Sequence, residues 1–79
     1  MADVQIEYCV ECMYLERALE VTEALLNDFP ERIEGLTLVP GTRGVFTVSL
    51  DGEPVSEIEP GELPPAVADV HAKVANGLA

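Results

Sequence analysis

Apolar and polar residues alternate in several short stretches of this chain. In residues 4–8, Val4, Ile6 and Tyr8 fall on one face of an extended chain, and Gln5 and Glu7 fall on the other. Such alternation predicts a strand with one buried face. The pattern predicts three more strands, over residues 33–39, 45–50 and 53–58.

Two other segments have apolar residues at spacings of three and four, as in an amphipathic helix. The first segment covers residues 13–29, and Pro30 helps to end it. In the second segment, Pro64 or Pro65 can occupy the first helical turn. Its recurring apolar positions are Leu63, Val67, Val70, Val74 and Leu78. The predicted order of elements is therefore β-α-β-β-β-α.

Turn residues separate the last three predicted strands. Residues 40–44 contain one proline and two glycines and are expected to form a loop. Asp51 and Gly52 favour a two-residue type I′ turn between the third and fourth strands. Because Pro54 cannot donate a ladder hydrogen bond, the fourth strand is expected at an edge of the sheet.

The polar residues of the predicted strands indicate how the layers stack. A sheet with helices on both faces has continuously apolar strands, but three of these strands carry polar residues on one face. These residues are Gln5, Glu7, Thr37, Thr47 and Ser49. We therefore predict an α/β (α+β) fold in which residues 1–79 form one domain, a two-layer sandwich with a four-stranded mixed sheet and both helices on one face. The first βαβ unit should be a right-handed parallel crossover, whereas strand orders 2-1-3-4 and 1-2-3-4 both remain open.

The charge of the chain excludes some classes of partner. Fifteen Asp and Glu face four Lys and Arg, for a net charge of −11. Because binding to phosphate requires clustered cations, neither nucleic acid nor an anionic membrane is an expected partner. No apolar run approaches the roughly 20 residues that span a bilayer, and the first residues lack the pattern of a secretory signal. We expect a cytoplasmic protein.

The excess of carboxylates also predicts a response to salt. High ionic strength screens repulsion between surface carboxylates, so we interpret the acidic composition as an adaptation to a salt-loving (halophile) host, with an acidic mesophile protein as the alternative. We expect Tm to rise between low salt and molar salt in thermal unfolding followed by circular dichroism. A Tm that stays constant or falls contradicts the halophile interpretation.

The candidate chemistry lies in Cys9 and Cys12, the two cysteines of the chain. They fall between the first predicted strand and the first predicted helix, an arrangement typical of thioredoxin-like redox proteins. Unpaired amides and the positive end of a helix dipole stabilise a thiolate there, which lowers the pKa of the thiol. Zinc is the main alternative, but a structural zinc site needs four ligands. The chain offers no third cysteine, and its one histidine, His71, is far along the sequence.

Several segments together resemble the selenoprotein W-like family (SelT/SelW/SelH, or Rdx family) of thioredoxin-like proteins. They occur in the order and at the length of that family and cover nearly the whole chain. The segments are Tyr8-Cys9-x-x-Cys12-x-Tyr14, Asp28-Phe29-Pro30, Gly44-Val45-Phe46-Thr47-Val48, Asp51-Gly52 and Val55.

The resemblance implies a thioredoxin-like fold and a thiol redox role. The selenocysteine of selenoprotein members maps onto Cys12, whereas the attacking cysteine of thioredoxin-type oxidoreductases maps onto Cys9, so either residue can be the attacking one. We expect Cys9 to project from the loop and Cys12 to lie nearer the helix start. Two departures from the family stand out: Met13 replaces a common glycine, and the carboxylate of Glu11 beside the sulfurs should raise the cysteine pKa values.

From these features we predict a thiol–disulfide redox protein in which Cys9 and Cys12 cycle between dithiol and disulfide. The expected partner is a protein disulfide or a low-molecular-weight thiol, and no organic cofactor or metal is required. The chain is expected to be a monomer or a weak dimer. The alternative is a redox-sensing or metal-holding interaction module without turnover, so the prediction leaves open whether the protein is a thiol oxidoreductase.

Overall fold

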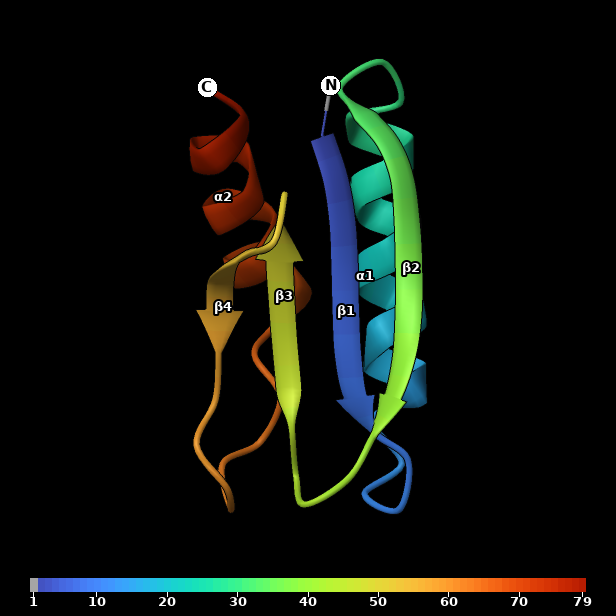
Figure 1. Ribbon diagram of the computed structural model, residues 1–79, viewed down its shortest axis with the longest axis vertical. Helices are drawn as coiled ribbons and strands as arrows, with labels where there is room; N and C mark the ends of the chain where they lie inside the picture. The colour runs from blue at the N-terminus through green and yellow to red at the C-terminus, as the bar shows by residue number, and fades with distance from the viewer. Residues whose placement is uncertain (1) are drawn as a thin grey trace.

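The computed structural model describes residues 2–79 and has the predicted order of elements, β-α-β-β-β-α (Figure 1). Strands and helices alternate only at the start of the chain, and a hairpin precedes the second helix. The elements are β1 (Ala2–Cys9), α1 (Leu15–Asp28), β2 (Ile33–Gly41), β3 (Phe46–Leu50), β4 (Glu53–Glu57) and α2 (Val67–Leu78).

The four strands form one mixed sheet in the order β2-β1-β3-β4. β1 is parallel to β2 and antiparallel to β3, and β3 pairs with β4 as an antiparallel hairpin. Of the two strand orders that the sequence left open, 2-1-3-4 is the one observed. β1 is therefore a central strand, and residues 42–45 pass its end to join β2 to β3.

Both helices cover the same face of this sheet, as predicted (Figure 1). α1 packs on β1 and β2, α2 packs on β3 and β4, and the two helices contact each other. On the open face, Gln5 and Thr37 are exposed, and Thr47 and Ser49 are partly exposed. The fold is the predicted thioredoxin-like two-layer sandwich.

The core lies between the sheet and the helices. The apolar face of α1 repeats at spacings of three and four, which brings its small and branched side chains onto β1 and β2. Phe46 is the largest fully buried side chain. The other core residues with no exposed surface are Ile6, Cys9, Ala18, Val21, Leu25, Val48, Val70 and Val74.

Three predicted boundaries near the start of the fold are wrong by two residues. β1 begins at Ala2 rather than at residue 4. α1 begins at Leu15 rather than at residue 13, because Met13 has a φ of 63°, which lies outside the right-handed helical region. β2 extends to Gly41 and includes Pro40. A proline is tolerated there because β2 lies at an edge of the sheet, where no second neighbour requires its missing N–H.

The predicted start of the second helix is also wrong. α2 begins at Val67, and Ala66 before it is extended, with φ −65° and ψ 150°. Pro64 is followed by a second proline, and a residue in that position disfavours the helical backbone conformation. Arg17 Nη1 also donates hydrogen bonds to the carbonyl oxygens of Pro65 (2.6 Å) and Pro64 (3.4 Å). These carbonyls therefore accept hydrogen bonds from a side chain of α1.

The hairpin between β3 and β4 is confirmed. Asp51 and Gly52 have φ values of 53° and 87°, and both are positive, as a type I′ turn requires. Pro54 lies in β4, which is the second edge strand of the sheet. Both edges therefore contain a proline.

Candidate redox site

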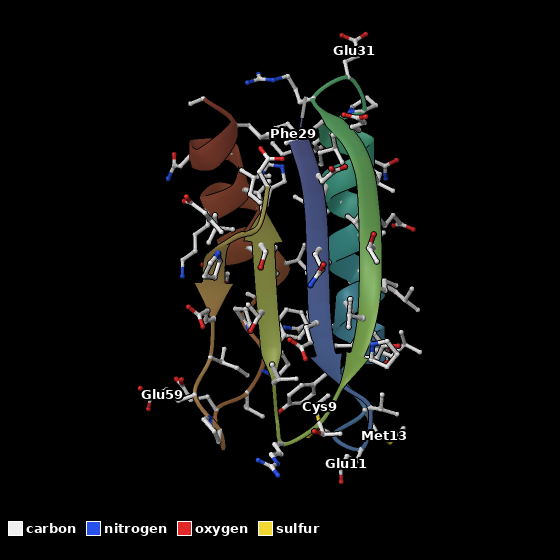
Figure 2. All side chains as sticks on the ribbon, viewed as in Figure 1. Cys9, Glu11, Met13, Phe29, Glu31 and Glu59 are labelled. Atoms are coloured by element: carbon white, nitrogen blue, oxygen red, sulfur yellow. A yellow bond between two sulfur atoms is a disulfide. The ribbon has the colours of Figure 1, made fainter. Side chains whose placement is uncertain are left out.

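The two cysteines form a disulfide where β1 ends. Cys9 is the last residue of β1, and Cys12 lies in the short turn before α1, with 5.3 Å between the two Cα atoms. The turn projects from one end of the molecule, where Cys9, Glu11 and Met13 lie together (Figure 2). The sequence predicted both residues of this pair.

Backbone hydrogen bonds to the two ends of one connecting segment hold the end of β1. The N–H of Cys9 donates to the carbonyl of Val45 at 2.8 Å, and the N–H of Val10 donates to the carbonyl of Gly41 at 3.1 Å. Val45 and Gly41 lie at the two ends of the segment that joins β2 to β3. The crossing of this segment past β1 therefore fixes the position of Cys9.

A tight turn then reverses the chain toward α1. The N–H of Met13 donates to Val10 O (3.1 Å), and the N–H of Tyr14 donates to Cys9 O (3.2 Å). Met13 closes the turn in the left-handed region, with φ 63°. That conformation costs a residue other than glycine of order 1–3 kcal/mol, so the turn holds Met13 under strain.

The two sulfur-bearing residues differ in exposure. Cys9 has no exposed surface, whereas Cys12 is exposed. The expectation that Cys9 projects from the loop is therefore wrong, because its strand hydrogen bonds hold it against the core. A molecule that approaches from solvent meets Cys12.

The hydrogen-bond donor closest to the buried sulfur comes from the turn. The N–H of Cys12 points at Cys9 Sγ at 3.2 Å. A helix N-terminus was expected beside the sulfurs, but α1 begins only at Leu15, three residues beyond Cys12. The local amide of Cys12 thus supplies the hydrogen bond that was expected from the helix.

Tyr14 connects this turn to the segment between β4 and α2. Its ring packs against Phe46 in an edge-to-face arrangement, with 6.3 Å between centroids, and its hydroxyl donates to Glu62 O at 3.1 Å. Arg17, three residues further on, binds the carbonyls of the two prolines of the same segment. Hydrogen bonds therefore hold residues 62–65 against the start of α1.

His71 lies away from the cysteines. Its Nε2 is 2.7 Å from Asp28 Oδ2, and its ring lies 5.0 Å from that of Phe29. Phe29 and Cys9 lie at opposite ends of the molecule (Figure 2). Among residues 2–79, the structure brings together no three His, Cys, Asp or Glu side chains that could hold a metal ion.

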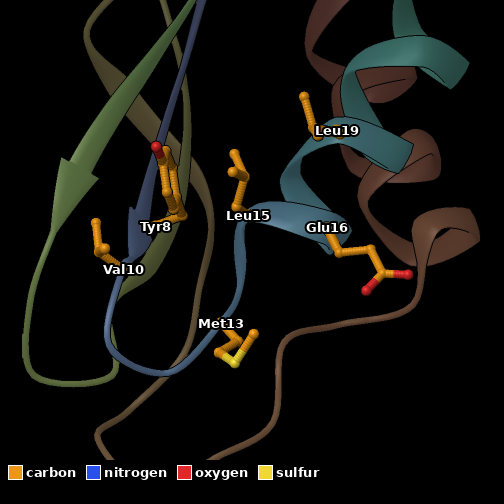
Figure 3. Close-up of a pocket in the computed structure, with 6 residues that line it drawn as sticks. All are labelled: Tyr8, Val10, Met13, Leu15, Glu16 and Leu19. Carbon is orange, nitrogen blue, oxygen red and sulfur yellow. The ribbon is translucent and has the colours of Figure 1, made fainter.

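Beside the disulfide, the structure shows an apolar groove that the sequence analysis did not predict (Figure 3). Its walls come from the end of β1, the cysteine turn and the first turns of α1. The residues that line it are Tyr8, Val10, Met13, Leu15, Glu16 and Leu19. One available signal was the spacing of Leu15 and Leu19, which lie four residues apart and off the core face of α1, whose buried residues are Ala18, Val21 and Leu25.

The fold and the paired cysteines at the end of its central strand define a thioredoxin-like protein. The family model of the Rdx family matches residues 3–76 of the chain. The chain therefore belongs to the Rdx family, the selenoprotein W-related proteins, in agreement with the resemblance noted above.

Solved structures support this assignment. A crystal structure of a protein from Bordetella parapertussis has 30% sequence identity and a TM-score of 0.86, with 96% of each chain covered. The crystal structure of a selenoprotein W-related protein from Vibrio cholerae has 27% identity and a TM-score of 0.88, and 99% of this chain and 98% of that chain are covered. Among curated proteins, none matches the chain significantly. Neither helix between residues 2 and 79 is long and apolar enough to cross a membrane.

Proposed function

We propose that this chain is a thiol–disulfide redox protein in which Cys9 and Cys12 are the reacting residues. The observation that carries the proposal is their disulfide, which joins a buried cysteine to an exposed cysteine at the end of the central strand β1. Membership of the Rdx family supports a thiol redox role. The cytoplasm is the proposed compartment, since it keeps thiols reduced and can reset such a pair.

The difference in exposure supports a separate role for each cysteine. In the oxidised form, an external thiolate reaches Cys12 Sγ, forms a mixed disulfide with it and expels Cys9 as a thiolate. The N–H of Cys12, 3.2 Å from Cys9 Sγ, can stabilise the negative charge that develops on this leaving sulfur. A second external thiolate then displaces Cys12 and leaves the dithiol form.

The oxidation of the dithiol follows the same path in reverse. Cys12 as thiolate attacks one sulfur of a substrate disulfide, that S–S bond breaks, and the departing substrate thiolate takes up a proton. Cys9 then loses its proton and attacks Cys12 Sγ, which releases the second substrate thiol. The substrate disulfide gains two electrons and the protein loses two, as thiol–disulfide exchange requires. The substrate is a protein disulfide or a low-molecular-weight disulfide, and a dithiol or a monothiol in excess is the reductant.

A redox titration tests the proposal. We expect the Cys9–Cys12 disulfide to form and open reversibly in buffers of defined thiol/disulfide ratio, with a two-electron dependence of about 30 mV per tenfold change in the equilibrium constant. Samples are quenched with acid and alkylated under denaturing conditions, because Cys9 is buried in the folded protein. Mass spectrometry should then find both cysteines modified at reducing potentials and neither at oxidising potentials. Failure to form a reversible intramolecular disulfide contradicts the carrier mechanism.

A further inference from the structure

The groove is an apolar surface partly built from the cysteine turn, in which Cys12 is an exposed residue. Val10 and Met13 belong to the cysteine turn itself, and Leu15 and Leu19 extend the same surface along α1 (Figure 3). The exposed fractions of Val10 and Met13 are 54% and 82%. Its volume of about 370 Å³ lies near the lower end of the range of ligand pockets, roughly 300–1,000 Å³. The groove is thus suited to one or two apolar side chains.

Met13 is the most unusual residue of this surface. It is held in a left-handed conformation that favours glycine, and it also exposes a large apolar side chain. Both properties are unfavourable in the isolated protein. A bound partner that covered Met13 would offset the second cost. Methionine is also well suited to such a role, because its flexible thioether side chain adapts to different contact surfaces.

The charges around the groove restrict the kind of partner. Glu16 forms part of its wall, and Glu11 lies in the cysteine turn, exposed to solvent. With a net charge of −11, a second copy of this chain would be repelled from this face. An acidic disulfide would be repelled for the same reason. Basic groups on a partner would be attracted and would approach faster.

We propose that the groove docks a segment of a partner polypeptide in which an apolar residue lies next to the reacting cysteine and basic residues flank the pair. The apolar side chain enters the groove between Met13 and Leu19, and the basic groups face Glu11 and Glu16. This places the partner's sulfur at Cys12. The inference rests on the proposed function, because it names the substrate class of that site.

Symmetric peptide disulfides provide the test. The reduced protein is mixed with disulfide-linked dimers of three short peptides: one with leucine beside cysteine and flanking arginines, one with serine in place of leucine, and one with glutamates in place of the arginines. Each rate constant is divided by the rate constant of dithiothreitol with the same peptide, which removes differences in intrinsic reactivity. We expect the leucine–arginine peptide to react about tenfold faster than each of the other two, and its advantage over the glutamate peptide to shrink in molar salt.

Variants of the protein test whether the preferences for leucine and arginine arise in the groove. Burial of one apolar side chain is expected to change the rate about tenfold. Met13→Gly should therefore remove most of the leucine preference, and it leaves the core intact because glycine accepts the positive φ. Leu63→Ser is the matched control, since Leu63 is 83% exposed and lies outside the groove. Glu16→Gln should weaken the arginine preference, and Glu23→Gln, on the same helix but outside the groove, should not.

The outcomes separate this inference from the proposed function. Equal normalised rates for the three peptides overturn docking, and so does an apolar preference that ignores the sign of the charge. A leucine preference that survives Met13→Gly overturns the assignment of the groove. In each of these cases the protein still exchanges with the small, uncharged hydroxyethyl disulfide. A protein that fails to react with hydroxyethyl disulfide at all contradicts the redox function itself.

Discussion

Replacing Cys12 by serine is expected to reduce disulfide exchange to the uncatalysed rate. Cys12 is the exposed member of the pair, and serine supplies no thiolate to attack a disulfide at neutral pH. The remaining thiol, Cys9, has no exposed surface and would react only when the end of β1 opens. The measurement is the second-order rate constant for reduction of hydroxyethyl disulfide by the reduced variant, compared with the unsubstituted protein.

Cys9→Ser is the informative partner of that variant. It leaves Cys12 free to attack but removes the thiol that resolves the mixed disulfide, so the reaction should stop at a stable adduct on Cys12. Mass spectrometry of the intact protein would detect this adduct. If the two phenotypes are exchanged, so that Cys12→Ser accumulates an adduct on Cys9, the roles drawn from exposure are wrong.

Replacing Phe46 by alanine is expected to cause the largest loss of stability of any single core substitution. Phe46 is fully buried, pairs with Tyr8 across β1 and β3, and carries the ring of Tyr14 against it. Truncation of a buried phenylalanine costs about 3–5 kcal/mol. Domains are stable by only about 5–15 kcal/mol, and small ones have less core than most. Urea unfolding of the disulfide form should show this loss in the free energy of unfolding.

Two further variants make that result specific. Leu63→Ala removes an equally apolar side chain from an exposed position and should change the free energy of unfolding by no more than about 0.5 kcal/mol. Phe46→Leu keeps most of the buried volume and should cost much less than alanine. A loss below about 1 kcal/mol for Phe46→Ala would contradict the position of this ring at the centre of the core.

The sheet and its layers could be predicted from the sequence because each depends on local pattern. Alternation in β1 and polar residues such as Thr47 and Ser49 indicated that one face of the sheet is open to solvent, and the structure has this open face. The strand order could not be derived in this way. It depends on where the segment after β2 crosses, and the hydrogen bonds that fix the crossing join residues far apart in the sequence, such as Cys9 and Val45.

The start of α2 shows how a tertiary contact overrides periodicity. Leu63 continues the spacing of the apolar positions, yet it lies outside the helix and is almost fully exposed. Arg17, from the other helix, binds the carbonyls of Pro64 and Pro65, and this segment stays outside the helix. The consecutive prolines indicate a late helix start, but the contact with Arg17 cannot be read from residues 63–78.

The candidate site could be predicted in its residues but not in its geometry. Spacing and position identified Cys9 and Cys12. Continued alternation would have turned the side chain after Tyr8 outward, but Cys9 is buried because the chain turns directly after it. The methionine itself gives no signal for the left-handed conformation of residue 13, since few large side chains adopt it. The available signal was the glycine that is common at this position in the family.

The central position of β1 has a consequence during synthesis on the ribosome. Cys9 and Cys12 are translated before β2 and β3, yet the carbonyls that hold the end of β1 belong to Gly41 and Val45. Until those residues have left the exit tunnel, neither thiol is shielded. The difference between a hidden and an accessible cysteine therefore arises only late in translation, and nascent chains should be more easily captured by oxidants than the finished protein.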